Sequence, residues 1–168
     1  MNNGFLRVAG IVEESIVDGD GLRFSLFLQG CKRACPGCHN KNTWDLSGGS
    51  LISIDEITER ITSNPLLTGV TFSGGEPFLQ AENLIALAKK IQRENLNLWC
   101  YTGNTYEEIL EKNDKHEISL LDEIDVLVDG EYIEHLRDLT LKFRGSKNQR
   151  VIDLNETKKT GRIVLKYE

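Results

Sequence analysis

Three cysteines within eight residues are the part of the sequence best suited to chemistry. Cys31, Cys35 and Cys38 form a C-x3-C-x2-C run directly after a strand-like stretch, whereas the fourth cysteine, Cys100, stands apart. Three thiolates on one tight loop can bind three corners of a metal cluster, while a four-iron cluster normally takes four cysteines. Three ligands therefore leave one iron with an open position, and an open position distinguishes catalytic from structural metal centres.

A structural zinc site is the alternative interpretation of the same thiols. His39 or Cys100 would then supply the fourth ligand of a tetrahedral ion. Two observations weigh against it. His39 directly follows Cys38, and adjacent residues seldom wrap around one ion. The second pair of ligands at short spacing that zinc modules usually contain does not follow in the sequence. A non-catalytic zinc-binding module remains the alternative from a different functional class.

A second candidate motif is Gly74-Gly75-Glu76-Pro77, which ends a short apolar stretch. In parallel α/β folds the carboxyl ends of the strands form the ligand-binding edge, and the cysteine run also follows a strand. Two glycines let a small molecule approach the backbone closely, and the Glu76 carboxylate can accept from an ammonium group. On its own the segment is most simply a strand-to-helix turn, and only its combination with the cysteine run indicates a cofactor site.

The elements that must position these motifs alternate between two periodicities. Period-two patterning predicts strands, and apolar residues at helical spacing predict helices. Strands are expected over 5–13, 22–28, 69–72, 96–102 and 124–128, and helices from 53 to 64 and over 81–94. Beyond residue 130 we expect a short helix over 131–138 and a hairpin between 151–154 and 163–167.

This order of strands and helices predicts the fold class. Strand and helix alternate in the first two thirds of the chain, which favours βαβ units. A closed eight-unit barrel needs ~250 residues, more than the 168 present. We therefore expect an α/β fold, namely an incomplete, open (β/α) barrel with a mostly parallel sheet.

Composition restricts the function classes further. The 168 residues are 39% apolar and 27% charged, which is ordinary for one globular domain spanning 1–168. A net charge of −6 argues against sequence-independent nucleic-acid binding. The longest apolar run has five residues, far fewer than the ~20 that cross a bilayer. With no export signal and with clustered thiols that suit a reducing compartment, we expect a cytoplasmic protein without membrane or nucleic-acid partners.

The two motifs together resemble those of the radical S-adenosylmethionine enzymes. More narrowly, the stretch from Asp18 to Trp44 resembles the anaerobic ribonucleoside-triphosphate reductase-activating proteins, a family of glycyl-radical activases. The segment from Phe143 to Asp153, which reads FRGSKNQRVID, is similar to the same branch. The likeness spans nearly the whole chain.

The resemblance implies a set of cofactors and site residues. A [4Fe-4S] cluster would be held by Cys31, Cys35 and Cys38, with S-adenosyl-L-methionine on its unique iron. The family segment that receives the methionyl amine matches Gly74, Gly75 and Glu76, and the part that borders the adenine matches the backbone around Gly37 and His39. No catalytic side chain is expected beyond cluster and cofactor. Many radical enzymes carry an aromatic residue where this chain has Gly37, so a ring-stacking role is not expected there.

The resemblance also implies an activity and partners. Reductive cleavage of S-adenosylmethionine would give methionine and a 5′-deoxyadenosyl radical, which removes a hydrogen from a glycine on the large subunit of the anaerobic reductase. The partners would be the glycine-bearing loop of that subunit and an electron donor such as a flavodoxin. Two enzyme alternatives remain, an activase for another glycyl-radical enzyme of the formate-lyase type and a synthase acting on a small pterin-like substrate.

Three further residues are candidates for a role in the site or in the core. Asp129 follows a predicted strand and is a candidate to bind cofactor or a cation. Arg23 either pairs with a carboxylate near the cluster or is solvated. Cys100 lies within an apolar strand and is expected to be a buried thiol that behaves as a small apolar group.

Overall fold

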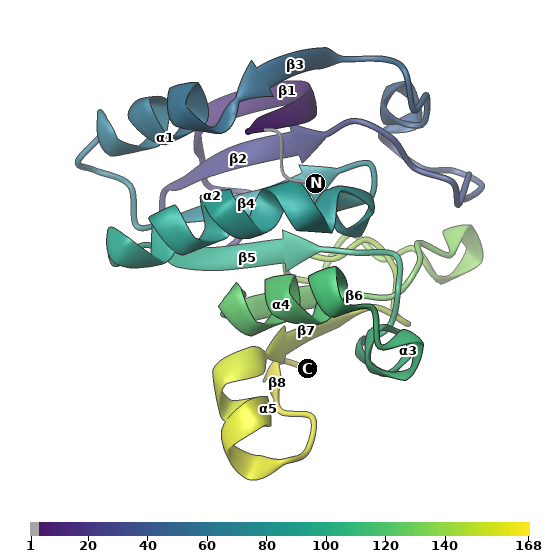
Figure 1. Cartoon of the computed structure of the whole chain (residues 1–168). Helices are drawn as coiled ribbons and strands as arrows, with labels where there is room; N and C mark the ends of the chain where they lie inside the picture. The colour runs from purple at the N-terminus through teal and green to yellow at the C-terminus, as the bar shows by residue number, and fades with distance from the viewer. Residues whose placement is uncertain (1–3) are drawn as a thin grey trace.

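A mixed sheet with helices on one face forms the framework of the protein (Figure 1). The computed structural model describes residues 4–168. The strands are β1 (Phe5–Ser15), β2 (Arg23–Leu28), β3 (Ser50–Ser53), β4 (Gly69–Gly74), β5 (Asn97–Tyr101), β6 (Val126–Asp129), β7 (Arg150–Asp153) and β8 (Leu165–Tyr167). The helices are α1 (Ile54–Thr62), α2 (Ala81–Arg93), α3 (Tyr106–Lys112), α4 (Lys115–Glu123) and α5 (Leu154–Thr160), with short 3-10 turns at Lys41–Thr43, Pro77–Gln80 and Glu134–Leu136.

The prediction of a mostly parallel sheet is wrong. The strand order is β3-β1-β2-β4-β5-β6-β7-β8, and only the three pairings among β2, β4, β5 and β6 are parallel. The four outer pairings are antiparallel. A short loop joins β1 to β2, and such a loop permits only antiparallel pairing, because parallel neighbours need a crossover of a dozen or more residues. With β3 at one end of the order and β8 at the other, the fold is an open mixed α/β sheet.

Apolar side chains cover one face of this sheet. Helices α1, α2 and α4 lie against that face (Figure 1), and the buried residues Leu84, Leu87 and Ile91 of α2 belong to the same core cluster as Leu26 and Phe72 of the strands. Ser53 caps helix α1, since its hydroxyl accepts from the Glu56 amide at 3.1 Å, and the helix starts where the sequence predicts it. This apolar layer is the main core of the protein.

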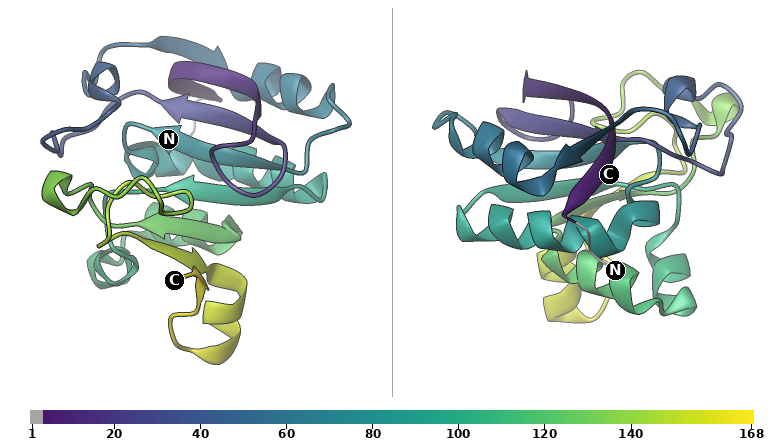
Figure 2. Two further views of the ribbon diagram at one scale, coloured as in Figure 1. Left: turned by 180° about the vertical axis from the view of Figure 1, so that it is seen from behind. Right: turned by 45° about the horizontal axis from the view of Figure 1, so that its top comes forward.

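Loops rather than helices cover the opposite face, as the view from behind shows (Figure 2). Residues 16–22, between β1 and β2, and residues 130–149, between β6 and β7, extend over it. The second segment is held by an aromatic cluster in which the Phe143 ring lies 5.2 Å from that of Trp99 and 5.9 Å from that of Tyr167. The loop-covered face is therefore available for a site. Within residues 4–168, every helix is too short or too polar to cross a membrane.

Arg23 fulfils neither of its predicted roles. Its side chain is 1% exposed and lies at the start of β2, whereas the cysteine loop follows the end of that strand. Burial lowers the pKa of Arg23 to about 10, which leaves the guanidinium charged at neutral pH. Its hydrogen bonds of 2.7–2.9 Å run to the Thr71 hydroxyl and to the carbonyls of Asp20, Val70 and Asn97. Arg23 thus joins β2, β4 and β5 near the starts of these strands, at the opposite end of β2 from the cysteine loop.

The region after β6 departs from the sequence prediction in two places. The helix expected over 131–138 is only the 3-10 turn Glu134–Leu136. The strands of the expected hairpin do pair as β7 and β8, but helix α5 connects them. Asp153 caps that helix by accepting from the Glu156 amide at 3.0 Å, a start signal that the sequence prediction overlooked.

Replacing Arg23 by Leu is expected to destabilise the protein by at least about 3 kcal/mol, because several buried acceptors lose their donor. The free energy of unfolding in urea measures the effect. Arg93→Leu, at an exposed position in the last turn of α2, serves as the control and is expected to change stability by less than about 0.5 kcal/mol. Equal unfolding midpoints for the two variants would contradict the role assigned to Arg23.

Candidate cluster and cofactor site

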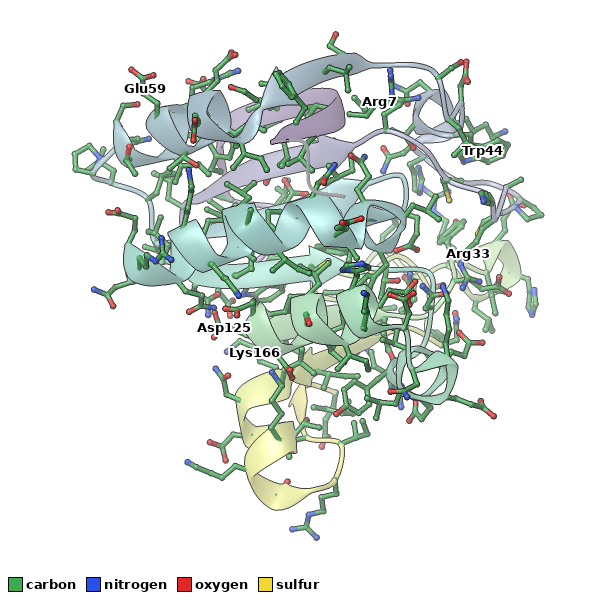
Figure 3. All side chains as sticks on the ribbon, in the orientation of Figure 1. Arg7, Arg33, Trp44, Glu59, Asp125 and Lys166 are labelled. Carbon is green, nitrogen blue, oxygen red and sulfur yellow. The ribbon has the colours of Figure 1, made fainter. Side chains whose placement is uncertain are left out.

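One cavity of about 490 Å³ on the loop-covered face brings both sequence motifs together. Strands β2 and β4 are parallel, with Leu28 opposite Gly74, so the segments that follow them meet at one edge of the sheet. The cavity is lined by seven of the eight predicted site residues, namely Cys31, Cys35, Cys38, His39, Gly74, Gly75 and Glu76. Figure 3 shows Arg33 and Trp44 at this same end of the molecule.

The cysteine loop is held at its base and in its turn by backbone hydrogen bonds. The amides of Gly30 and Cys31 donate to the carbonyls of Thr43 and Trp44, at 2.6 and 3.2 Å, and the Cys38 amide donates to the Cys35 carbonyl at 3.1 Å. All three thiols are free and partly exposed. Burial, with a contribution from the Glu131 carboxylate, raises the pKa of the Cys35 thiol.

The side chains available as metal ligands fit an iron–sulfur cluster better than a single metal ion. Across residues 4–168, no three His, Cys, Asp or Glu side chains come close enough to hold one metal ion. Cys100 is fully buried in the core cluster beneath the helices, on the other face from the cavity, so it cannot complete a tetrahedral site there. Three thiols spread along one loop instead suit the separated corners of an iron–sulfur cluster. The Asn40 amide lies 3.4 Å from the Cys38 sulfur and adds the kind of hydrogen bond that tunes such clusters.

The Gly-Gly-Glu segment is hydrogen-bonded directly to the end of β2. The Gly75 amide donates to the Leu28 carbonyl and the Glu76 amide to the Gly30 carbonyl, both at 2.8 Å. A Cβ on Gly75 would lie 2.4 Å from the Gly30 oxygen, and Gly74 has a φ of +95°. Both glycines are therefore needed by the backbone packing itself, in addition to any approach of a ligand.

The Glu76 side chain joins the ends of two strands. It is 6% exposed. One carboxylate oxygen accepts from the Phe78 amide at 3.1 Å and the Thr102 hydroxyl at 2.9 Å, and the other accepts from the Gly103 amide at 2.8 Å. Burial raises the pKa of Glu76, while these hydrogen bonds oppose the shift. The carboxylate thus fixes the loop after β5 against the end of β4, and its role toward an ammonium group stays a prediction.

Comparisons with known proteins identify the family. A family model described as a 4Fe-4S single cluster domain matches residues 17–152. Proteins called anaerobic ribonucleoside-triphosphate reductase-activating protein from Haemophilus influenzae, Vibrio cholerae and Escherichia coli K12 are 36%, 38% and 34% identical to this chain. Each alignment covers 80% of this chain and 89–90% of the relative. The chain belongs to the anaerobic ribonucleoside-triphosphate reductase-activating protein family.

One solved structure also resembles the chain. QueE from Escherichia coli is 18% identical, with a TM-score of 0.48 over 61% of this chain and 54% of that chain. The assignment to the activating-protein family depends on the sequence relatives.

Gly37, the eighth predicted site residue, does not line the cavity. It has a φ of +78°, and a Cβ there would lie 2.8 Å from the Glu134 carboxyl carbon. His39 lines the cavity, and its ring lies 5.6 Å from that of Tyr132. For this member of the activating-protein family, the contact of Gly37 and His39 with an adenine stays a prediction.

Asp129 takes part in a network of its own. It is 1% exposed, and its carboxylate accepts from the Arg150 guanidinium at 2.5 and 3.0 Å and from the Tyr106 amide at 2.7 Å. Arg150 also pairs with Glu107 at 2.6 Å. These contacts fix the start of α3 against β6 and β7, which accounts for Asp129 without a cofactor or cation.

Arg33 is a site residue that the sequence prediction missed. It stands between Cys31 and Cys35, and its guanidinium donates to the Asn104 side chain and lies 3.5 Å from Glu131 and 3.9 Å from Glu108. It therefore ties the cysteine loop to the segments after β5 and β6. Nothing in the sequence indicates this, because its partners are about 70 to 100 positions away.

The Glu76 carboxyl is expected to make stability depend on pH. Because its folded-state pKa is raised above the ordinary value of 4.5, the folded state holds the proton over a pH range in which the unfolded chain has lost it. The free energy of unfolding therefore falls as the pH rises from 4.5 through the raised pKa. Glu76→Gln is expected to remove that decline in a series of urea unfolding curves at increasing pH.

The exposed Glu59 of α1 provides the matched control. Glu59→Gln is expected to keep the wild-type pH dependence. A Glu76→Gln profile that runs parallel to that of the wild type would show that the carboxyl does not titrate as described.

Proposed function

We propose that this chain is an iron–sulfur activase that generates a glycyl radical on the anaerobic ribonucleoside-triphosphate reductase. The observation that carries the proposal is the meeting of three free thiols and the Gly-Gly-Glu segment in one cavity. Family membership supports it, since relatives with 34–38% identity have the name of that activating protein. We further propose that residues 1–168 work as one domain, in the cytoplasm, where thiols stay reduced.

Different residues of the chain would hold the cluster and S-adenosyl-L-methionine. Cys31, Cys35 and Cys38 would bind three irons of a [4Fe-4S] cluster. Gly74, Gly75 and Glu76 would receive the amino group of S-adenosyl-L-methionine, and the backbone near Gly37 and His39 would border its adenine. When bound, the cluster and S-adenosyl-L-methionine supply a one-electron cleavage that yields methionine and a 5′-deoxyadenosyl radical.

The remaining parts of the site would orient the reactants and exclude water. Arg33 and Glu76 hold the segments after β2, β4 and β5 in a fixed arrangement, which matches the demand of radical chemistry for exact positioning. Residues from 16–22 and 130–149 line the cavity and would help to exclude water, whose removal protects a reactive species from side reactions. The large subunit would present its glycine-bearing loop to this cavity, and a donor such as a flavodoxin would supply the electron.

Cys35→Ala is expected to abolish both cluster assembly and cleavage of S-adenosylmethionine, because only two ligands remain. Anaerobically reconstituted wild type is expected to hold about four iron and four sulfide per chain, measured by chemical assay and visible absorption. Cys100→Ala is the matched control, since this thiol lies in the core on the other face, and it is expected to keep the cluster. Wild-type iron content and cleavage in Cys35→Ala would refute the ligand assignment.

Incubation of the reduced protein with S-adenosylmethionine and the large reductase subunit is expected to produce a glycine-centred signal in electron paramagnetic resonance spectra. The signal is expected to be lost when the glycine of the subunit is changed to Ala. A signal that forms only on another glycyl-radical enzyme would contradict the choice of the reductase.

A further inference from the structure

Part of the FRGSKNQRVID stretch has no role in the site described so far. Its residues Ser146, Asn148 and Gln149 lie between the 3-10 turn Glu134–Leu136 and strand β7. Ser146 is fully buried, although serine is mostly found on the surface of proteins. We call these three residues the clamp, because their side chains all bind the same short piece of backbone.

The clamp holds the backbone that directly follows β6. The Gly130 carbonyl accepts from the Gln149 side chain at 3.0 Å, the Glu131 carbonyl accepts from the Asn148 side chain at 2.8 Å, and the Ile133 amide donates to the Ser146 hydroxyl at 3.2 Å. Backbone groups on both sides of residue 132 are therefore fixed, and the amide of Tyr132 is directed toward a different acceptor.

The clamp is itself held in one arrangement. The side-chain oxygen of Gln149 accepts from the amides of Gly145 and Ser146, at 2.8 and 3.1 Å. A Cβ at Gly145 would lie 3.1 Å from the Tyr132 ring, so the glycine lets that ring pack closely against the clamp. Side-chain and backbone contacts thus place Tyr132 together.

The acceptor of the Tyr132 amide is the sulfur of Cys35. Both residues line the cofactor cavity and a second, neighbouring cavity, so the cysteine loop and the segment after β6 meet at this point. Burial raises the pKa of the Cys35 thiol, and the hydrogen bond from Tyr132 acts in the opposite direction, as a donor that stabilises the thiolate does.

Cys38 also receives an amide hydrogen bond, but from within its own loop. The donor is the amide of Asn40, 3.4 Å from the sulfur, and the Asn40 carbonyl accepts from the Thr43 amide and hydroxyl at 2.9 and 2.6 Å. The donor to Cys35 instead comes from a segment far along the chain. Only the contacts of that segment, the clamp among them, keep it in place.

Hydrogen bonds to the sulfurs of an iron–sulfur cluster contribute to its reduction potential. Reduction adds one negative charge to the cluster, and an N–H that points at a ligand sulfur stabilises negative charge there. The reduced state gains more from such a bond than the oxidised state, so the bond raises the potential.

We propose that Ser146, Asn148 and Gln149 are positioning residues that hold the Tyr132 amide on the Cys35 sulfur and thereby raise the reduction potential of the cluster. An external one-electron donor then reduces the cluster more easily. This inference rests on the proposed function, since it takes the cluster on the three cysteines as given, and it adds residues that control how readily that cluster accepts its electron.

The test measures the midpoint potential of the anaerobically reconstituted protein, without S-adenosylmethionine, in redox titrations followed by electron paramagnetic resonance. Asn148→Ala and Ser146→Ala are each expected to make the potential more negative by about 30 to 60 mV, which is a three- to tenfold change in the equilibrium of a one-electron couple. Asn155→Ala is the matched control, because this exposed side chain bonds Asp125 instead. It is expected to keep the wild-type potential.

A backbone substitution tests the donor itself. The α-hydroxy acid analogue of tyrosine at position 132 replaces the amide by an ester, which removes the N–H and keeps every side chain. The ester protein is expected to show a shift in the same direction and range. Ser146→Ala in this background is expected to shift the potential less than it does in wild type, because the donor that it positions is gone. A clamp that only stabilises the loop would give the same shift in both backgrounds.

The outcomes distinguish this inference from the function beneath it. If wild type holds the cluster, but the ester protein or both clamp variants have the wild-type potential, the inference is overturned and the proposed function stands. The ester protein decides the question even if a clamp variant does not assemble a cluster. If reconstituted wild type holds no iron–sulfur cluster, the proposed function itself fails.

Discussion

The hydrogen-bonded junction between the ends of β2 and β4 is the constraint on which the site depends. The carbonyls of Leu28 and Gly30 receive the amides of Gly75 and Glu76, and the lack of a side chain at Gly75 lets the two backbones come this close. Because β2 and β4 are parallel, the cysteine loop and the Gly-Gly-Glu segment leave the sheet at the same edge. Without this junction the two motifs would be separate loops.

Two charged side chains extend the junction to neighbouring strands. The Glu76 carboxylate links the end of β4 to the loop after β5, and Arg33 connects the cysteine loop to Asn104 and Glu131. At the other end of β2, Arg23 joins the same three parallel strands through their carbonyls. Glu76 and Arg33 themselves line the cavity, so its walls are fixed by polar interactions as well as by the core.

The sequence predicted the parts of the fold whose periodicity is strong. Strands β2, β4 and β5 and helix α2 lie close to their expected positions, because the strands place alternate residues in the core cluster and the helix places residues there at helical spacing. Strand β3, with four residues, and helix α4, with weak segregation of apolar residues, were not foreseen. Period-two patterning shows that a segment is a strand but does not reveal the direction of its neighbour, which is why the mixed sheet was predicted as mostly parallel.

For the site, spacing along the chain was enough to find the motifs but not their surroundings. Residues that act within one loop, such as Cys31, Cys35 and Cys38, were recognisable from their separation alone. Arg33 has its partners far along the chain, and only the folded structure reveals that it shares a cavity with Tyr101 and Arg144. For Asp129 the sequence suggested too much. Its place at a strand end suggested that it binds a ligand, whereas in the structure Arg150 and the Tyr106 amide donate hydrogen bonds to its carboxylate.

One face of the sheet is covered by helices and the other by loops, and this separates the residues that determine folding stability from those that form the surface for other proteins. Stability comes mainly from the apolar layer under α1, α2 and α4, where a change of volume disturbs many neighbours. The loops of 16–22 and 130–149 place only two apolar side chains, Leu22 and Phe143, against the core clusters, so most substitutions along them cost little folding free energy. Relatives with this architecture can therefore diverge in the surface they offer to other proteins while the framework that holds the cysteines stays the same.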